Sequence, residues 1–242
     1  MTMSTKSLDS APQLVIRDLV KRYHFQPVLN QLSLTLTDGD FCILVGANGA
    51  GKTTLLRILA TLVRPNQGEI LLGGRSLTQS PALRREIGYI GHQPMFYNDL
   101  TALENLHHYA RLYAYPHPAE LVRDAVQSVG LTPHQHKPVR TFSRGMQQRL
   151  SIARALLHHP HYLFFDEPYT GLDTEAAQIL DAQLQYLHQP GRIILLAAHQ
   201  PGRLLRMASH IAWLQDGKIS HHIPAASIPE VPALQAYLQE GA

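Results

Sequence analysis

Short, unbroken apolar runs alternate along this chain with longer segments in which apolar residues recur every three or four positions. An unbroken run of about five apolar residues is typical of a strand buried on both faces, and the longer spacing is typical of an amphipathic helix. Strands are therefore predicted at 14–16, 32–36, 41–45, 69–72, 87–90, 162–165 and 193–197, followed by a hairpin of 211–214 and 218–220. Strands separated by helices predict a mostly parallel sheet that is covered on both faces.

The segments with helical spacing crowd into the middle of the chain. Thr101 and Glu104 form a capping-box pattern before one of them, and Ser143 is a favourable N-cap before another. Helices are predicted at 52–62, 101–113, 119–129, 143–158, 174–187 and 232–239, with a loop rich in His, Pro and Gln at 132–141. We expect a single domain, residues 1–242, with a sheet core (12–92 and 159–221), a helical insert (93–158) and a C-terminal tail (222–242).

Composition narrows the class of protein. The formal net charge of the 242 residues is +3, without a basic cluster, so no nucleic-acid partner is expected. The single cysteine, Cys42, lies in an apolar run, which indicates a small core residue and suits a reducing compartment. No apolar segment approaches the roughly 20 residues that span a membrane, and the polar residues 1–12 lack the apolar core of a signal peptide. We therefore expect a chain that is neither secreted nor membrane-spanning.

Residues 46–53 match the phosphate-binding pattern G-x-x-x-x-G-K-[ST]. The setting is the required one, because a predicted strand ends at Val45 and a predicted helix begins near Gly51. Glycines let backbone N–H groups turn toward phosphate oxygens, Lys52 adds a positive charge, and the Thr53 hydroxyl is a ligand for Mg²⁺. The residues assigned to nucleotide binding here are Gly46, Asn48, Gly49, Ala50, Gly51, Lys52, Thr53 and Thr54.

Two carboxylates follow the predicted strand 162–165. Ligands collect at the carboxyl ends of parallel strands, so Asp166 is placed beside the phosphate loop as a candidate for holding Mg²⁺. Glu167 should point in another direction and is the candidate general base that polarises an attacking water. Acidic pairs are also common in solvated turns, and the nearby phosphate loop favours the functional interpretation.

These stretches, together with residues 142–150, resemble the nucleotide-binding subunit of ABC transporters over nearly the whole chain. The resemblance implies a P-loop NTPase of the α/β class, with a mostly parallel sheet core, an N-terminal antiparallel β part and an inserted helical subdomain. It also implies that Ser143 and Gly145 contact the γ-phosphate of ATP bound to a second subunit. Arg144 and Met146 depart from the common signature sequence, and the same variant is familiar among exporter ATPases.

The resemblance extends to four further positions. It implies that Gln93 senses Mg²⁺ and the attacking water, and that His199 bridges the γ-phosphate and the opposite subunit. The resemblance also implies that Asp173, in the loop 171–173, faces across the dimer. It further implies that Tyr23 stacks on adenine, with Phe25 as a rival. The implied activity is ATP hydrolysis with ATP and Mg²⁺, by a homodimer that drives integral membrane subunits from the cytoplasmic face of the cell membrane.

Residues 90–94, 100–106 and 199–201 are similar to the ATPase subunits of haem exporters of cytochrome c maturation. An exporter of drugs, polysaccharides or another small cargo is the nearest alternative, since cargo is chosen by other subunits. A soluble ABC ATPase acting on ribosomes or nucleic acid generally has two nucleotide domains or a coiled-coil insert. A third interpretation is a regulatory subunit that binds ATP without hydrolysing it, and such a subunit would lack the catalytic base. The 15 histidines are irregularly spaced without cysteines, so direct metal or haem ligation is not expected.

Overall fold

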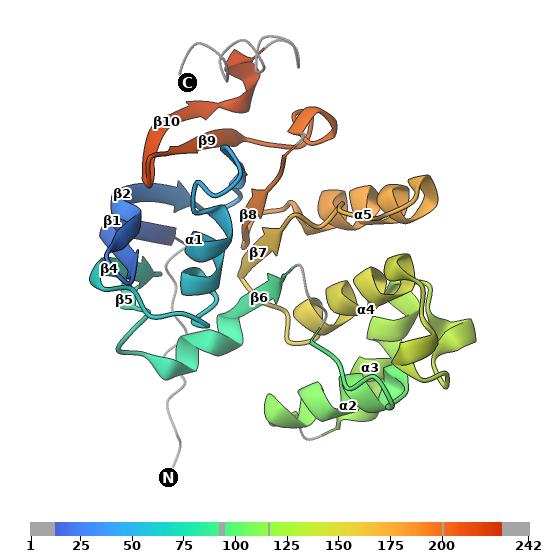
Figure 1. Cartoon of the computed structure of the whole chain (residues 1–242). Coiled ribbons are helices and arrows are strands. Elements are labelled where there is room, and N and C mark those ends of the chain that lie inside the picture. Colours follow the sequence, from blue (N-terminus) through green and yellow to red (C-terminus); the bar gives the residue numbers. More distant parts are fainter. Residues whose placement is uncertain (1–12, 92–94, 116, 200, 229–242) are drawn as a thin grey trace.

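The computed structural model of the chain describes residues 13–91, 95–115, 117–199 and 201–228. Six strands form the larger sheet, in the order β10-β9-β3-β8-β7-β6. Strands β9, β3, β8, β7 and β6 pair in parallel, and β10 is antiparallel to β9 (Figure 1). Their bounds are β3 Phe41–Val45, β6 Ile87–Ile90, β7 Tyr162–Asp166, β8 Ile193–Ala197, β9 His210–Gln215 and β10 Lys218–Pro224.

The central strands are buried on both faces, as their unbroken apolar runs predicted. Every residue of β3, β7 and β8 is buried. Side chains alternate between two cores: Phe41 and Ile43 pack with the helices on one face, and Cys42 and Leu44 pack with the other face. Cys42 is buried, which confirms the prediction of a small core residue, and this burial raises the pKa of its thiol.

The smaller sheet is antiparallel and confirms the expected N-terminal β part. Its order is β2-β1-β4-β5. The predicted strands 14–16 and 32–36 were too short, because exposed polar residues alternate with buried ones such as Leu32 and Leu34 along a sheet that has only one buried face. The bounds are β1 Gln13–Tyr23, β2 Gln26–Thr37, β4 Gln67–Leu72 and β5 Arg75–Ser76.

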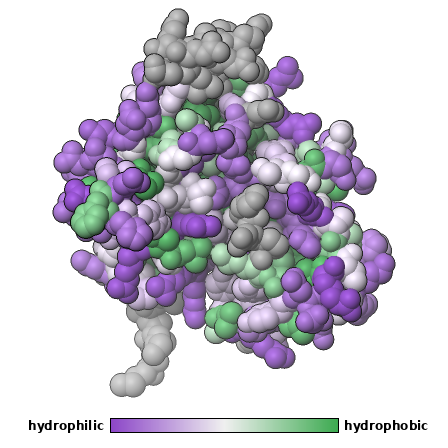
Figure 2. Space-filling view, viewed as in Figure 1, coloured by the Kyte–Doolittle hydropathy of each residue, from purple (hydrophilic) through white to green (hydrophobic). Residues whose placement is uncertain are grey.

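The predicted helices that fall within the described residues all form. Helices α2, α3 and α4 pack together on one side of the strands in Figure 1, and α4 also contacts β6. Hydrophobic side chains are scattered among hydrophilic ones over this part of the surface (Figure 2). The helices are α1 Lys52–Leu59, α2 Ala102–Leu112, α3 Pro118–Ser128, α4 Arg144–Leu156 and α5 Thr174–Leu187, with short 3-10 helices η1 Pro81–Glu86, η2 Thr132–His134, η3 Val139–Thr141, η4 Pro201–Arg203 and η5 Ala225–Ser227.

Helix boundaries follow the caps. Thr101 and Glu104 form the predicted capping box, and Ser143 accepts a hydrogen bond from the Met146 N–H at 3.2 Å. Helix α1 ends before the predicted position 62, because the chain turns into the left-handed region at Thr61. The predicted loop 132–141 contains η2 and η3. The predicted helix 232–239 lies outside the described residues.

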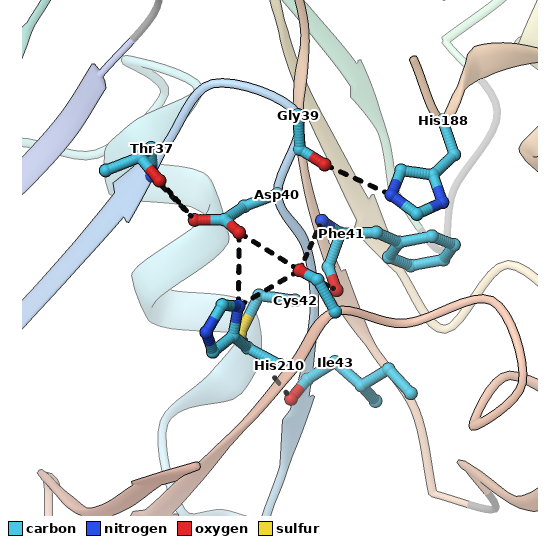
Figure 3. Close-up of polar contacts among 9 residues, drawn as sticks. Thr37, Gly39, Asp40, Phe41, Cys42, Ile43, His188 and His210 are labelled. Atoms are coloured by element: carbon cyan, nitrogen blue, oxygen red, sulfur yellow. Dashed lines mark hydrogen bonds and ion pairs between the residues drawn. The ribbon is translucent and has the colours of Figure 1, made fainter. Parts of the chain in front are cut away.

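The edge of the large sheet that lies opposite the phosphate loop is held by a polar cluster (Figure 3). Asp40, just before β3, accepts a hydrogen bond from the Thr37 N–H at 2.7 Å and lies 3.1 Å from Nδ1 of His210. Ser209 donates to the same carboxylate at 3.1 Å and lies 3.0 Å from the same ring nitrogen. A serine nucleophile would need the other ring nitrogen, so this Ser-His-Asp set ties β3 to β9 and is not a catalytic triad.

Among the residues that the structure describes, no helix combines the length and apolar character needed to cross a bilayer.

Candidate nucleotide-binding site

The phosphate loop occupies the predicted place between the end of β3 and the start of α1. Two glycines are required by close approach. A Cβ on Gly46 would lie 2.4 Å from the Leu214 carbonyl oxygen. Gly51 has φ +108°, and a Cβ there would lie 2.9 Å from the Leu29 side chain. The loop is therefore pressed against β2 and β9, and no larger residue fits at these positions.

Lys52 is folded back over the loop. Its Nζ donates to the carbonyl oxygens of Gly46 at 2.6 Å and Ala47 at 3.0 Å. Burial lowers the pKa of the ammonium, and the nearby carboxylates of Glu167 and Asp166 oppose that shift. A largely buried cation in contact with a glycine-rich loop fits an anionic ligand such as a nucleotide phosphate.

Thr53 and Asp166 meet although they are far apart in the sequence. The Thr53 hydroxyl donates to Oδ1 of Asp166 at 3.0 Å, and Asp166, at the end of β7, is buried. A hydroxyl and a carboxylate beside a phosphate site are the oxygen ligands that suit Mg²⁺, which keeps several waters and needs few protein ligands. The Thr53 and Asp166 oxygens therefore fit Mg²⁺ that is held jointly with phosphate.

Glu167 and His199 form the second pair at this edge. Nε2 of His199 lies 2.8 Å from Oε1 of Glu167, and both line a cavity of about 370 Å³. Glu167 has φ +52°, in the left-handed region where non-glycine residues are uncommon, and its N–H donates to the Ala197 carbonyl at 3.1 Å. This backbone turn sends Asp166 toward Thr53 and Glu167 toward His199. The expectation that the two carboxylates point in different directions is confirmed.

Ser143, Gly145 and Asp173 lie at the starts of α4 and α5. Asp173 caps α5 by accepting from the Ala176 N–H at 2.8 Å. A Cβ on Gly145 would lie 3.2 Å from the Ala176 Cβ, so the two helix starts pack closely. Ser143 and Asp173 are exposed. Their roles toward ATP stay predictions.

Tyr23 and Phe25 remain candidates for stacking on adenine. Tyr23 is 43% exposed at the end of β1, with the Lys21 ammonium 5.0 Å from its ring centroid, and Phe25 is 99% exposed. Gln93 lies outside the described residues.

Sequence reasoning missed one wall of the site. A cavity of about 910 Å³ beside the phosphate loop is lined by residues 26–28 of β2 and residues 213–217 of the β9–β10 hairpin. A Cβ on Gly217 would lie 2.8 Å from the Val28 carbonyl oxygen. The Asp216-Gly217 signal predicted the turn, but no local pattern predicts that this turn packs against the phosphate loop.

A phosphate loop between a buried strand and a helix, with a Thr–Asp pair and a Glu–His pair at the carboxyl edge of the same sheet, defines a P-loop nucleotide hydrolase. The family model "ABC transporter" matches residues 29–170. The chain therefore belongs to the ATP-binding proteins of the ABC transporter family, and it is an ATPase of that family.

The similar proteins belong to the same family, but their names give different transport roles. The chain is 38% identical over 185 residues to the cytochrome c biogenesis ATP-binding export protein CcmA of Xylella fastidiosa (strain 9a5c), covering 76% of this chain and 82% of that protein. It is 35% identical over 209 residues to the bacitracin transport ATP-binding protein BcrA of Bacillus licheniformis, covering 86% and 68%. A solved ATP-binding subunit of an ABC transporter superposes with a TM-score of 0.84 at 28% identity, covering 93% of this chain and 99% of that one.

Proposed function

We propose that this chain binds MgATP at the phosphate loop and hydrolyses it to power an exporter that handles haem for cytochrome c biogenesis. Lys52 and the loop hold the phosphates, and Thr53 and Asp166 hold Mg²⁺. Glu167 polarises the attacking water, and His199 contacts the γ-phosphate. The observation that carries the hydrolytic part is the 2.8 Å contact between Glu167 and His199, next to the Thr53–Asp166 pair.

Two further sets of residues complete the proposed site. Tyr23 stacks on adenine, and Gln93 senses Mg²⁺ and water. The exposed Ser143 and Asp173, together with the half-buried Gly145, serve the ATP of a second copy of the chain, so the working unit is a head-to-tail dimer. ABC ATP-binding domains generally dimerise and pair with membrane subunits, which supports this arrangement.

The proposed cargo rests on similarity to CcmA and on residues 90–94, 100–106 and 199–201. The alternative is an exporter of a drug, a polysaccharide or another small molecule, and the match to the bacitracin transport protein BcrA favours it to a similar degree. Recovery of the membrane subunits would distinguish these cargoes, because cargo is chosen by subunits other than this one.

We place the membrane partner on a groove of about 490 Å³ that runs between the end of α1, β6, α2 and α4. Its rim exposes Leu62, Met95 and Leu112, which are 51%, 40% and 65% exposed. The guanidinium groups of Arg84 and Arg154 also line it. Such a groove suits a short amphipathic helix from a cytoplasmic loop of a membrane subunit. The proposed location is therefore the cytoplasmic face of the cell membrane.

Co-purification from detergent-solubilised membranes, with mass spectrometry of the partners and an ATPase assay, tests this proposal. Multi-helix membrane subunits of the cytochrome c maturation type, with ATPase activity that depends on Glu167, are expected. Recovery of an unrelated permease would change the proposed cargo and leave the ATPase assignment intact. Sedimentation with ribosomes or nucleic acid, and with no membrane protein, would contradict the transporter assignment.

A further inference from the structure

The Asp181 carboxylate, near the Glu167–His199 pair, contacts two side chains that come from different segments. The Tyr169 hydroxyl donates to Oδ1 of Asp181 at 2.6 Å. Nε of Arg203 lies 3.5 Å from Oδ2 of the same Asp181. The Arg203 guanidinium carbon also lies 6.0 Å from the centroid of the Tyr169 ring. Tyr169 and Arg203 line the same 370 Å³ cavity as Glu167 and His199.

Each of these two side chains is close in the chain to one member of the catalytic pair. Tyr169 is in the turn that starts at Glu167, where the Thr170 N–H donates to the Glu167 carbonyl at 3.2 Å. Arg203 ends η4, the short 3-10 helix that follows the segment of His199. Asp181 belongs to neither segment, because it lies in α5. Helix α5 is therefore the common support of both.

We propose that Tyr169, Asp181 and Arg203 are positioning residues that hold Glu167 and His199 at hydrogen-bonding distance. The inference rests on the catalytic roles proposed above for that pair. Glu167 has a left-handed backbone, a conformation that persists only where surrounding contacts fix it. Catalysis by a positioned base is sensitive to displacement, with about 10²-fold lost for a shift of about 1 Å.

The two contacts differ in strength. Burial raises the pKa of the Tyr169 hydroxyl, and the hydrogen bond to Asp181 adds to the shift, so Tyr169 stays a neutral donor. The Arg203 side chain is 46% exposed, and water screens its attraction to Asp181. Tyr169 is therefore expected to be the stronger positioning residue.

The same helix also reaches the region expected to face a second subunit. Asp173 caps α5, and Ala176 in its first turn packs against Gly145 at the start of α4. The Arg144 guanidinium lies against Gly171 in the preceding loop, 3.1 Å from the place of a Cβ there. A movement of the α4 start would thus be transmitted through α5 to Asp181 and to the catalytic pair.

Steady-state ATP turnover of the full chain tests this inference with Tyr169→Phe, Arg203→Gln and the double variant. Tyr186→Phe and Arg206→Gln are matched controls, because Tyr186 is on α5 and 71% exposed and Arg206 is exposed. Loss of alignment should lower kcat about tenfold in Tyr169→Phe and about threefold in Arg203→Gln, with KM for ATP unchanged. The double variant should lose less than the product of the two, because both side chains act through Asp181. Arg203→Lys should recover part of kcat.

Glu167→Gln, measured in parallel, distinguishes a failure of the proposed catalytic roles from a failure of the positioning inference. If Glu167→Gln retains turnover, the catalytic roles are wrong, and the positioning inference is overturned with them. If it abolishes turnover while Tyr169→Phe and Arg203→Gln match their controls, only the positioning inference is overturned. A lower melting temperature with kcat unchanged below the transition would show a structural role alone and also contradict it.

Discussion

The carboxyl edge of the large sheet and the starts of α4 and α5 both carry residues expected to meet ATP, but their surroundings are opposite. At the sheet edge, Lys52 and Asp166 are buried, and Asp166 accepts from a threonine of another element. At the helix starts, Ser143 and Asp173 are exposed, and their side chains accept from backbone N–H groups of their own helices.

This difference supports the proposal that the sheet-edge region is assembled within one chain and that the helix starts act on the ATP of a second copy. The Thr53–Asp166 and Glu167–His199 pairs are already within hydrogen-bonding distance in one chain. The exposed caps satisfy local backbone groups, which does not prevent a second role in binding. Variants at the sheet edge should therefore change nucleotide binding by the single chain or the chemical step itself, and variants at the helix starts should change only steps that need two chains.

The largest effect is expected at the sheet edge from Glu167→Gln. Removing the base should lower kcat by about 10²- to 10⁴-fold, while ATP affinity stays close to that of the natural chain. Rapid-quench ATPase assays and equilibrium binding with a fluorescent ATP analogue measure the two quantities. Unchanged turnover would reject Glu167 as the base.

Lys52→Ala should act on binding in the same region. Loss of a charge-assisted contact to phosphate should weaken ATP binding by about 10- to 100-fold. Isothermal titration calorimetry gives the affinity, and the exposed Lys137→Ala is a control for charge loss. If Lys52→Ala binds ATP as tightly as the unsubstituted chain, the phosphate-loop assignment is wrong.

Away from both regions, the contact between the end of α4 and the start of β6 should respond to pH. His158, just after α4, bonds through Nε2 to the Ile87 carbonyl of β6 at 2.8 Å and stacks on Tyr113, with ring centroids 4.0 Å apart. Burial lowers the pKa of His158 from 6.5 to about 4. The unfolded chain takes up this proton near pH 6.5, so stability present above pH 6.5 is lost as the pH falls toward 4, by about 3 kcal/mol.

Urea unfolding between pH 7.5 and 4.5 measures this loss. His158→Phe keeps an aromatic ring against Tyr113 and should flatten the pH dependence of the free energy of unfolding. An equal slope in both proteins would show that other groups are responsible.

The smallest effect separates capping from binding at the helix starts. Ser143→Ala and Thr101→Ala each remove a helix cap and should each cost about 1 kcal/mol of stability. Only Ser143→Ala should also reduce turnover, because only Ser143 is expected to meet the ATP of a second chain. Equal turnover in the two variants, measured well below their melting temperatures, would leave Ser143 as a cap alone.

The same contrast explains how much could be predicted from sequence. The phosphate loop, the buried strands and the caps at Thr101 and Ser143 follow from local spacing, and each formed as predicted. The opposite directions of Asp166 and Glu167 also followed, because neighbouring side chains at a strand end diverge. Such features depend on residues close together in the chain.

Contacts between distant segments left no such signal. Tyr169, Asp181 and Arg203 belong to three segments, and no periodicity predicts that one carboxylate receives the other two. The wall formed by residues 213–217 is hidden for the same reason, as was the full length of β1, whose outer face is polar. These features depend on tertiary packing, which single-sequence patterns do not encode.

Sedimentation of Glu167→Gln with MgATP or MgADP tests most directly the claim that one region is complete and the other needs a partner. A chain that binds ATP without hydrolysing it should accumulate as a dimer with MgATP and remain a monomer with MgADP. Ser143→Ala in the same background should weaken that dimer. Tight ATP binding by a chain that stays monomeric at every concentration, with or without its membrane partner, would contradict the account.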